Sequence, residues 1–156
     1  MIVYLGLGSN LGDKRKNIEK ALALIAERVG DVRALSGFYE TPSWGYTSSH
    51  TYLNAVARIE TPLRPEDLLF ATQDIERESG RTEKTIGRAY RDRIIDIDIL
   101  LYGDLVIQTP LLTIPHPLMH QRAFVLQPLS EISPDLIHPV LGKTIAEIYS
   151  TSENDK

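Results

Sequence analysis

Apolar residues recur along this chain with two different periods, and the switches between them predict the order of its elements. An apolar residue at every second position indicates a half-buried strand, whereas spacings of three and four indicate one face of a helix. The pattern predicts a strand, a helix, two strands, a helix and a strand. We expect the strands at residues 2–8, 32–40, 52–61 and 93–102, and helices that end near residues 29 and 79.

The two expected helices have separate start and stop signals. In the first, the apolar residues from Ile18 to Val29 are four, three and four positions apart, and Gly30 ends the pattern. In the second, Pro65 stands near the first turn and Gly80 follows the last one. Proline at the start and glycine just past the end are the favoured residues at helix ends.

The final third of the chain predicts shorter elements. We expect a strand at 105–107, a helical piece near 118–122 and a last helix at 144–150, with a disordered tail from about residue 150. No repeat or linker divides the sequence, so we expect residues 1–156 to form a single domain. The element order is typical of the α+β class and of a ferredoxin-like plait, an antiparallel sheet with its helices on one face. The other face would hold a substrate cleft.

Composition limits the partners of this chain. Its 156 residues are 42% hydrophobic and 24% charged, as in ordinary globular domains. A net charge of −4 argues against nucleic-acid binding, and the absence of cysteine excludes disulfides and thiolate chemistry. The N-terminus has neither a basic region nor a sustained apolar run. We therefore expect a cytoplasmic protein that does not bind membranes.

An acidic pair lies in the last long strand. Asp96 and Asp98 alternate with isoleucines, so both carboxylates project from one face of the strand, with Cα atoms roughly 6.6 Å apart. Neighbouring carboxylates repel each other unless a cation lies between them. Magnesium is the natural candidate, because it takes one or two carboxylates together with phosphate oxygens and water. A solvated sheet face is the alternative interpretation.

Basic residues precede this strand and favour the phosphate interpretation. Five of them stand within thirteen positions, at Arg81, Lys84, Arg88, Arg91 and Arg93. A cationic loop beside paired carboxylates suits a polyphosphate that carries its own metal. A salt-bridged surface would explain one or two of these residues more readily than all five.

Other candidate residues each have a structural alternative. Tyr52 and Asn54 share a strand face and suit a flat heterocycle, although packing and a turn bond would also explain them. Phe124 is a second candidate stacking ring or a core residue. His116, fixed between two prolines, and Arg122 could contact an anion.

Two further segments have weaker interpretations. The glycines at 6–12 do not fit a dinucleotide-binding loop, and we interpret them as a structural turn. Gln73 and Glu76 share one face of the second helix, where a solvated surface is the default. Within the sequence, no nucleophile has a base at a suitable spacing, which favours catalysis by positioning and charge neutralisation.

Several motifs, in order along the chain, resemble one enzyme family. They are Gly8-Ser9-Asn10-Leu11-Gly12, Phe38-Tyr39-Glu40-Thr41-Pro42, Tyr52-Leu53-Asn54-Ala55, the acidic strand, Pro115-His116-Pro117 and residues 122–129. Together they resemble the 6-hydroxymethyl-7,8-dihydropterin pyrophosphokinases of folate biosynthesis, over about residues 2–148. The resemblance implies transfer of pyrophosphate from ATP to the hydroxymethyl group of the pterin, with release of AMP.

The resemblance also implies roles for individual residues. Two Mg²⁺ ions would be held by Asp96 and Asp98. The catalytic residues would be these two with Arg81, Lys84 and Arg93. The pterin would be bound by Thr41, Pro42, Trp44, Tyr52, Asn54 and Phe124. ATP would be bound by Gln73, Glu76, Arg81, Lys84, Arg93, Ile99, Thr113, His116 and Arg122.

Some positions depart from relatives, and other functions remain open. Glu83 and Leu111 stand where some members have arginine, and Tyr90 stands roughly where a tryptophan can occur. The alternatives are a two-metal phosphodiesterase and a non-catalytic module that binds a nucleotide or small ligand. We expect a monomer whose partners are ATP and the pterin.

Overall fold

The fold is built on one antiparallel sheet and is described by a computed structural model at residues 1–42, 51–80 and 94–154. The model confirms the predicted α+β class and the antiparallel sheet. The five strands of this sheet are β1 (Ile2–Ser9), β2 (Asp31–Leu35), β3 (Tyr39–Pro42), β4 (Thr51–Glu60) and β5 (Asp96–Tyr102). The two long helices are α1 (Lys14–Arg28) and α2 (Pro65–Ser79).

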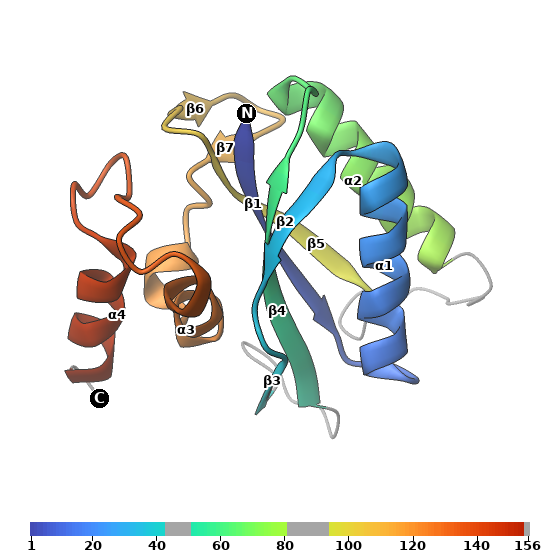
Figure 1. Ribbon diagram of the computed structural model, residues 1–156, viewed down its shortest axis with the longest axis horizontal. Helices are drawn as coiled ribbons and strands as arrows, with labels where there is room; N and C mark the ends of the chain where they lie inside the picture. Colours follow the sequence, from blue (N-terminus) through green and yellow to red (C-terminus); the bar gives the residue numbers. More distant parts are fainter. Residues whose placement is uncertain (43–50, 81–93, 155–156) are drawn as a thin grey trace.

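The strands are ordered β2-β4-β1-β5 across the sheet, and β3 pairs with β4 beyond the end of β2. Every pairing is antiparallel. Strand β1 therefore lies between β4 and β5, which places the segment of Tyr52 and the segment of Asp96 on either side of one central strand. Figure 1 shows this sheet edge-on between two groups of helices.

The α1 and α2 helices cover one face of the sheet. Their apolar residues, among them Ile25 and Ile75, are fully buried against Leu5 and Ile97 of the strands. Asp13 caps α1, because its side chain accepts a hydrogen bond from the main-chain nitrogen of Lys16 at 3.1 Å. The sequence predicted both helices, and the structure confirms them.

The opposite face also carries helices, which corrects the expectation of helices on one face only. Helix α3 (Ala123–Ile132) and helix α4 (Ile145–Asn154) lie there, as Figure 1 shows, together with a short 3-10 helix at Met119–Gln121. Leu126 and Leu129 of α3 pack with Tyr4 of β1 in a second core. Sequence analysis missed α3 because Pro128 stands inside it and because its apolar residues follow closely on two other prolines.

Two predicted strands have different limits in the structure. The strand expected at 32–40 is divided into β2 and β3, because the Ser36 side chain accepts the hydrogen bond of the Val56 main-chain nitrogen at 2.9 Å. The strand expected from residue 93 begins at Asp96. Its register shifts opposite Tyr4 and Leu5 of β1, so Leu100 and Leu101 are both buried in the second core.

The remaining elements complete the second half of the chain. A small two-stranded sheet pairs β6 (Ile107–Gln108) with β7 (Thr113–Ile114), where only one short strand was expected. Helix α4 extends to Asn154, beyond the expected end of the last helix. Among the described residues, no helix is both long and apolar enough to cross a membrane.

Candidate active site

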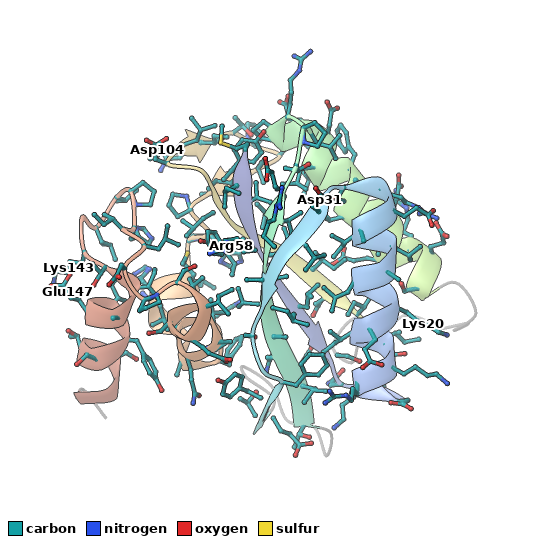
Figure 2. All side chains as sticks on the ribbon, in the orientation of Figure 1. Lys20, Asp31, Arg58, Asp104, Lys143 and Glu147 are labelled. Carbon is teal, nitrogen blue, oxygen red and sulfur yellow. The ribbon has the colours of Figure 1, made fainter. Side chains whose placement is uncertain are left out.

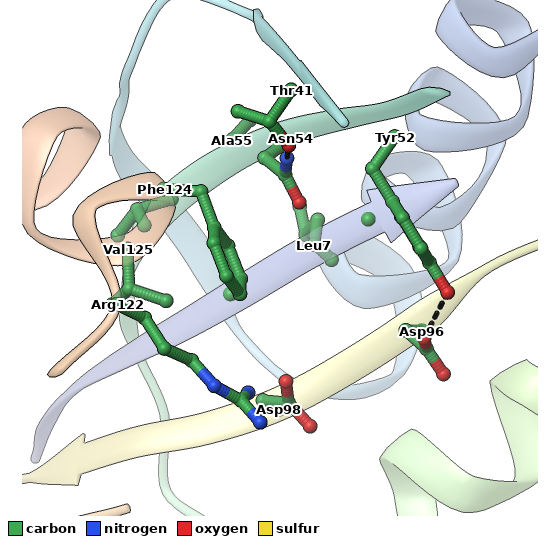
Figure 3. Close-up of a pocket in the computed structure, with 13 residues that line it drawn as sticks. Leu7, Thr41, Tyr52, Asn54, Ala55, Asp96, Asp98, Arg122, Phe124 and Val125 are labelled. Carbon is green, nitrogen blue, oxygen red and sulfur yellow. Dashed lines mark hydrogen bonds between the residues drawn. The ribbon is translucent and has the colours of Figure 1, made fainter. Parts of the chain in front are cut away.

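A pocket of about 160 Å³ lies on the sheet face opposite α1 and α2. Its walls come from β1, β3, β4 and β5 and from the start of α3 (Figure 3). The structure brings together seven of the residues selected from the sequence. They are Thr41, Tyr52, Asn54, Asp96, Asp98, Arg122 and Phe124.

The two carboxylates of β5 open into the same pocket. Asp96 and Asp98 are half-buried, whereas Ile97 between them is buried against α1 and α2. The register aligns Asp96 with Gly8 and Asp98 with Gly6 of the central strand. The alternation inferred from the sequence is therefore present, with the acids on the pocket face and the isoleucines in the core.

Gly8 forms the floor between the two sides of the pocket. It pairs with Asn54 on β4 and with Asp96 on β5, so the three residues form one row across the sheet. A Cβ atom at Gly8 would lie 3.1 Å from Oδ1 of Asn54 and 3.4 Å from a ring carbon of Tyr52. Only a residue without a side chain leaves this floor open.

The interpretation of residues 6–12 as a turn was therefore only partly right. Gly12 has a φ of 67° and forms a turn, whereas Gly6 and Gly8 belong to the strand that was predicted at residues 2–8. The signal that could have revealed their role is their spacing of two, which places both on one face of a strand. Ser9 and Asn10 are buried and do not line the pocket.

The amide and the tyrosine form the β4 side of the pocket. The Asn54 side-chain nitrogen donates to Oγ1 of Thr41 at 2.9 Å, which fixes the orientation of the amide. The Tyr52 hydroxyl lies 3.5 Å from Oδ2 of Asp96. Tyr52 thus reaches across β1 and connects the amide side with the carboxylate side.

Phe124 and Arg122 form the opposite wall. Figure 3 shows the rings of Phe124 and Tyr52 on either side of Asn54. The guanidinium carbon of Arg122 is 5.5 Å from the centre of the Phe124 ring, a distance at which cation and ring attract each other. The arrangement leaves a slot between two aromatic rings, with an amide at its base and a cation at its rim.

His116 lies beside this charged rim. Its Nδ1 accepts a hydrogen bond from the Leu118 main-chain nitrogen at 3.2 Å, which leaves Nε2 as the donor of a neutral imidazole. Burial lowers the pKa of His116 below its ordinary value; Asp98 opposes this shift and Arg122 adds to it. The charges of Asp98 and Arg122 are therefore close enough to shift the pKa of His116 in opposite directions.

Besides His116, four described residues predicted to bind ATP lie outside the pocket lining. Gln73 and Thr113 are exposed, and Ile99 is buried in the α1–α2 core. Because its side chain is enclosed, only the main chain of Ile99 could contact a ligand. Glu76 accepts a hydrogen bond from the Ile97 main-chain nitrogen at 2.7 Å, so it supports the strand between the two aspartates.

Several predicted residues fall outside the described part of the chain. Trp44, Arg81, Lys84 and Arg93 belong to this group, as do Glu83 and Tyr90. Pro42 is the last residue of β3, and the position of its side chain is not described. Leu111 is exposed on the segment between β6 and β7.

Comparisons with known proteins agree with this geometry. Residues 4–134 match the family described as 7,8-dihydro-6-hydroxymethylpterin-pyrophosphokinase. The chain is 52% identical over 139 residues to a 2-amino-4-hydroxy-6-hydroxymethyldihydropteridine pyrophosphokinase of Porphyromonas gingivalis, covering 88% of this chain and 94% of that one. It is 43% identical over 145 residues to a protein of the same name from Aquifex aeolicus, covering 93% and 88%.

Solved structures share the fold at lower sequence identity. Wild-type HPPK-DHPS of Plasmodium falciparum, crystallised with pterin and p-hydroxybenzoate, superimposes with a TM-score of 0.78 at 19% identity. The match covers 99% of this chain and 43% of that chain. This chain therefore belongs to the 7,8-dihydro-6-hydroxymethylpterin-pyrophosphokinase family, the pyrophosphokinases of folate biosynthesis.

Proposed function

We propose that the pocket holds 6-hydroxymethyl-7,8-dihydropterin against ATP, and that the chain transfers the β- and γ-phosphoryl groups as one unit to the pterin alcohol. The pterin oxygen forms a new bond to the β-phosphorus, the bond between the β-phosphorus and the α–β bridging oxygen breaks, that oxygen leaves with AMP, and the hydroxyl proton is released. The observation that carries the proposal is the single row of Asn54, Gly8 and Asp96, which sets a heterocycle-binding amide directly across from a carboxylate.

The slot between Tyr52 and Phe124 is the proposed pterin site. A flat ring can stack between two aromatic rings, and the amide of Asn54 can both donate to and accept from the ring edge. The bond between Asn54 and Thr41 supports this orientation. Pro42 and Trp44 are proposed as further contacts of the pterin.

The acidic pair is the proposed site of two Mg²⁺ ions. Both carboxylates open into one pocket, and oxygen ligands are those that Mg²⁺ prefers. Within residues 1–42, 51–80 and 94–154, no third acidic or histidine side chain joins them. Two carboxylates suit a metal that is also coordinated by phosphate oxygens better than a metal coordinated by protein side chains alone. The ions would neutralise the triphosphate charge.

The phosphate chain is proposed to extend from the acidic pair toward Arg122 and His116. Arg122 offers a cation at the rim of the pocket, and His116 can donate from Nε2. Arg81, Lys84 and Arg93 are proposed as further cations that act on the leaving group. Gln73, Glu76, Thr113 and the main chain of Ile99 are proposed to contact the nucleoside.

Catalysis would then depend on alignment rather than on a covalent intermediate. The pocket holds the alcohol and the phosphate chain at one end of β1, and the cations offset negative charge as the bond to AMP breaks. The element order β1-α1-β2-β4-α2-β5 supports a ferredoxin-like plait, and the enzyme is proposed to act as a monomer.

The products of the reaction test this proposal. With ATP, Mg²⁺ and 6-hydroxymethyl-7,8-dihydropterin, we expect equal amounts of AMP and pterin diphosphate, separated by ion-exchange chromatography. ADP as the product would contradict pyrophosphoryl transfer, and release of phosphate without the pterin would support the phosphodiesterase instead. Calorimetry of a non-hydrolysable ATP analogue should show binding that requires Mg²⁺.

A further inference from the structure

The first turn of α1 carries an unusual charge for its position. Lys14, Arg15 and Lys16 begin the helix, and its first turn has no acidic residue. The N-terminal end of a helix is positive, so cations are disfavoured there. This cost is offset where such a cation has partners on neighbouring elements, as Lys14 has.

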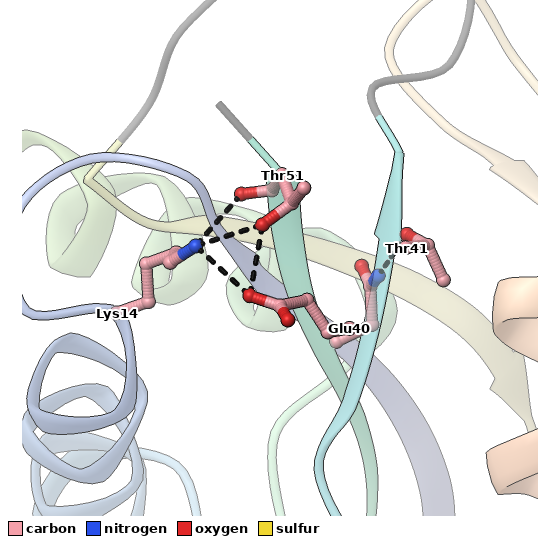
Figure 4. A network of polar contacts seen from close by, with 5 residues as sticks. Lys14, Glu40, Thr41 and Thr51 are labelled. Atoms are coloured by element: carbon pink, nitrogen blue, oxygen red, sulfur yellow. Dashed lines mark hydrogen bonds and ion pairs between the residues drawn. The ribbon is translucent and has the colours of Figure 1, made fainter. Parts of the chain in front are cut away.

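Lys14 has such partners on two neighbouring strands. Its ammonium group donates to Oγ1 of Thr51 at 2.9 Å, to the Thr51 main-chain oxygen at 3.2 Å and to Oε2 of Glu40 at 3.3 Å. The Thr51 hydroxyl donates in turn to the same oxygen of Glu40 at 2.9 Å. Figure 4 shows this closed network, in which only 25% of the Lys14 side chain is exposed.

Arg15 adds a second contact to the same segment. Its guanidinium carbon lies 4.6 Å from the centre of the Phe38 ring, just before β3 begins. The hydrogen bonds from Thr51 and Lys14 lower the pKa of Glu40, so its carboxylate remains charged at neutral pH. The helix start is thus attached to β3 by one ion pair and one ring contact.

The network lies directly behind the proposed pterin site. Along β3, Glu40 and Thr41 are consecutive and therefore project from opposite faces of the sheet. Thr41 pairs with Tyr52, the residue after Thr51, and its hydroxyl holds the Asn54 amide at 2.9 Å. Strand β3 has four residues and, among the described strands, pairs with β4 alone. A displacement of this short edge strand would move Thr41 and release the amide.

We propose that Lys14 is a positioning residue for the pterin: by joining Glu40 to Thr51 it fixes β3 against β4 and so sets the orientation of Thr41 and Asn54. This inference rests on the proposed function of the pocket. Lys14 contacts neither substrate in this arrangement and lies on the far side of the sheet from both carboxylates. Its removal should therefore affect pterin binding and leave ATP binding unchanged.

Steady-state kinetics of three variants test the proposal. Lys14→Met removes the charge and retains the apolar stem, Thr51→Val removes only the hydroxyl, and Lys14→Arg restores a cation. We expect the KM for the pterin to rise about tenfold in the first two, below the ~10²-fold that a 1 Å displacement can cost. The KM for ATP and kcat should stay within about twofold, and Lys14→Arg should recover most of the loss.

The control is Lys20→Met, a change of the same kind at an exposed position later in α1. Figure 2 shows Lys20 pointing away from the sheet. An unchanged pterin KM in both Lys14→Met and Thr51→Val would overturn the proposal. A fall in kcat together with a similar rise in the KM values of both substrates would overturn it as well. Wild-type protein that makes no AMP in the same assay would instead contradict the function proposed for the pocket.

Discussion

The two sides of the pocket are held in place by different forces. Strand β5, which carries the aspartates, buries Ile97 and Ile99 against one core and Leu100 and Leu101 against the other. Strand β3, which carries Thr41, is instead attached by polar contacts. The stabilisation from hydrophobic burial depends little on salt and pH. An exposed ion pair, in contrast, weakens when the salt concentration rises or when a change in pH neutralises one partner. The carboxylate side is therefore built to be rigid, and the heterocycle side to be adjustable.

The largest effect should come from the acidic pair. Asp96→Asn keeps the shape of the side chain and removes its charge, so turnover should fall at least about 10³-fold, as for the loss of a group that stabilises the transition state. The free energy of unfolding should change little. Asp104→Asn, in an exposed turn, is the matched control. Retained turnover in Asp96→Asn would show that this carboxylate is not needed for catalysis.

The second prediction compares how much β5 and β3 contribute to the free energy of unfolding. Ile97→Ala removes a buried side chain and should lower the free energy of unfolding by about 2–5 kcal/mol. Glu40→Gln on β3 removes one partner of an exposed ion pair and should lower the free energy of unfolding much less than Ile97→Ala does. Urea unfolding measures both values. Equal losses would refute the distinction between a rigid side and an adjustable one.

The floor between the two sides should be sensitive to volume. Gly8→Ala places a methyl group 3.1 Å from Oδ1 of Asn54, so the KM for the pterin should rise about tenfold, as for a small misplacement of the binding group. Gly6→Ala is the comparison, because its methyl group would meet Leu100 at an ordinary 3.5 Å. Gly6→Ala should raise the KM for the pterin less than Gly8→Ala does. A reversed order would show that Gly8 does not limit the pterin site.

The smallest effect concerns the second polar attachment of β3. The Tyr39 hydroxyl donates to Glu131 of α3 at 2.5 Å, and this bond raises the pKa of Tyr39 above its ordinary 10.0. A raised pKa in the folded state means that the stabilisation is complete below pH 10 and is lost as the pH rises through the folded value.

Tyr39→Phe should therefore cost about 1 kcal/mol at neutral pH and flatten the decline in stability above pH 10. Thermal unfolding followed between pH 7 and 11.5 measures this, with the range chosen to bracket the titration of tyrosine near 10. An unchanged alkaline decline in Tyr39→Phe would assign that decline to other groups.

The sequence predicted those parts of the fold that depend on local pattern. Alternation located β5 and placed Asp96 and Asp98 on one face, the spacing of apolar residues located α1, and Pro65 and Gly80 located α2. Helix α3 was missed because Pro128 weakens its local signal and burial in the second core stabilises it instead. The shifted register of β5 depends on pairing with β1, which no local pattern contains.

The site was predictable where residue type alone identifies chemistry. Aromatic, amide, acidic, hydroxyl and basic side chains could be selected from the sequence, and seven of the selected residues line one pocket. Gly8 was missed because its role is to leave space, which is visible only when Asn54 and Tyr52 lie beside it. Lys14 was missed because its partners are far away in sequence, at residues 40 and 51.

In the proposed pterin site, the row of Asn54, Gly8 and Asp96 would also limit which alcohols the enzyme can accept. Two strand spacings separate the outer members of this row, about 9.6 Å along the hydrogen-bonding direction. Main-chain hydrogen bonds hold this width, so it cannot contract or stretch to follow a different molecule. A pterin whose side arm is one carbon longer or shorter would place its oxygen at the wrong distance from the carboxylate, however well its ring were bound.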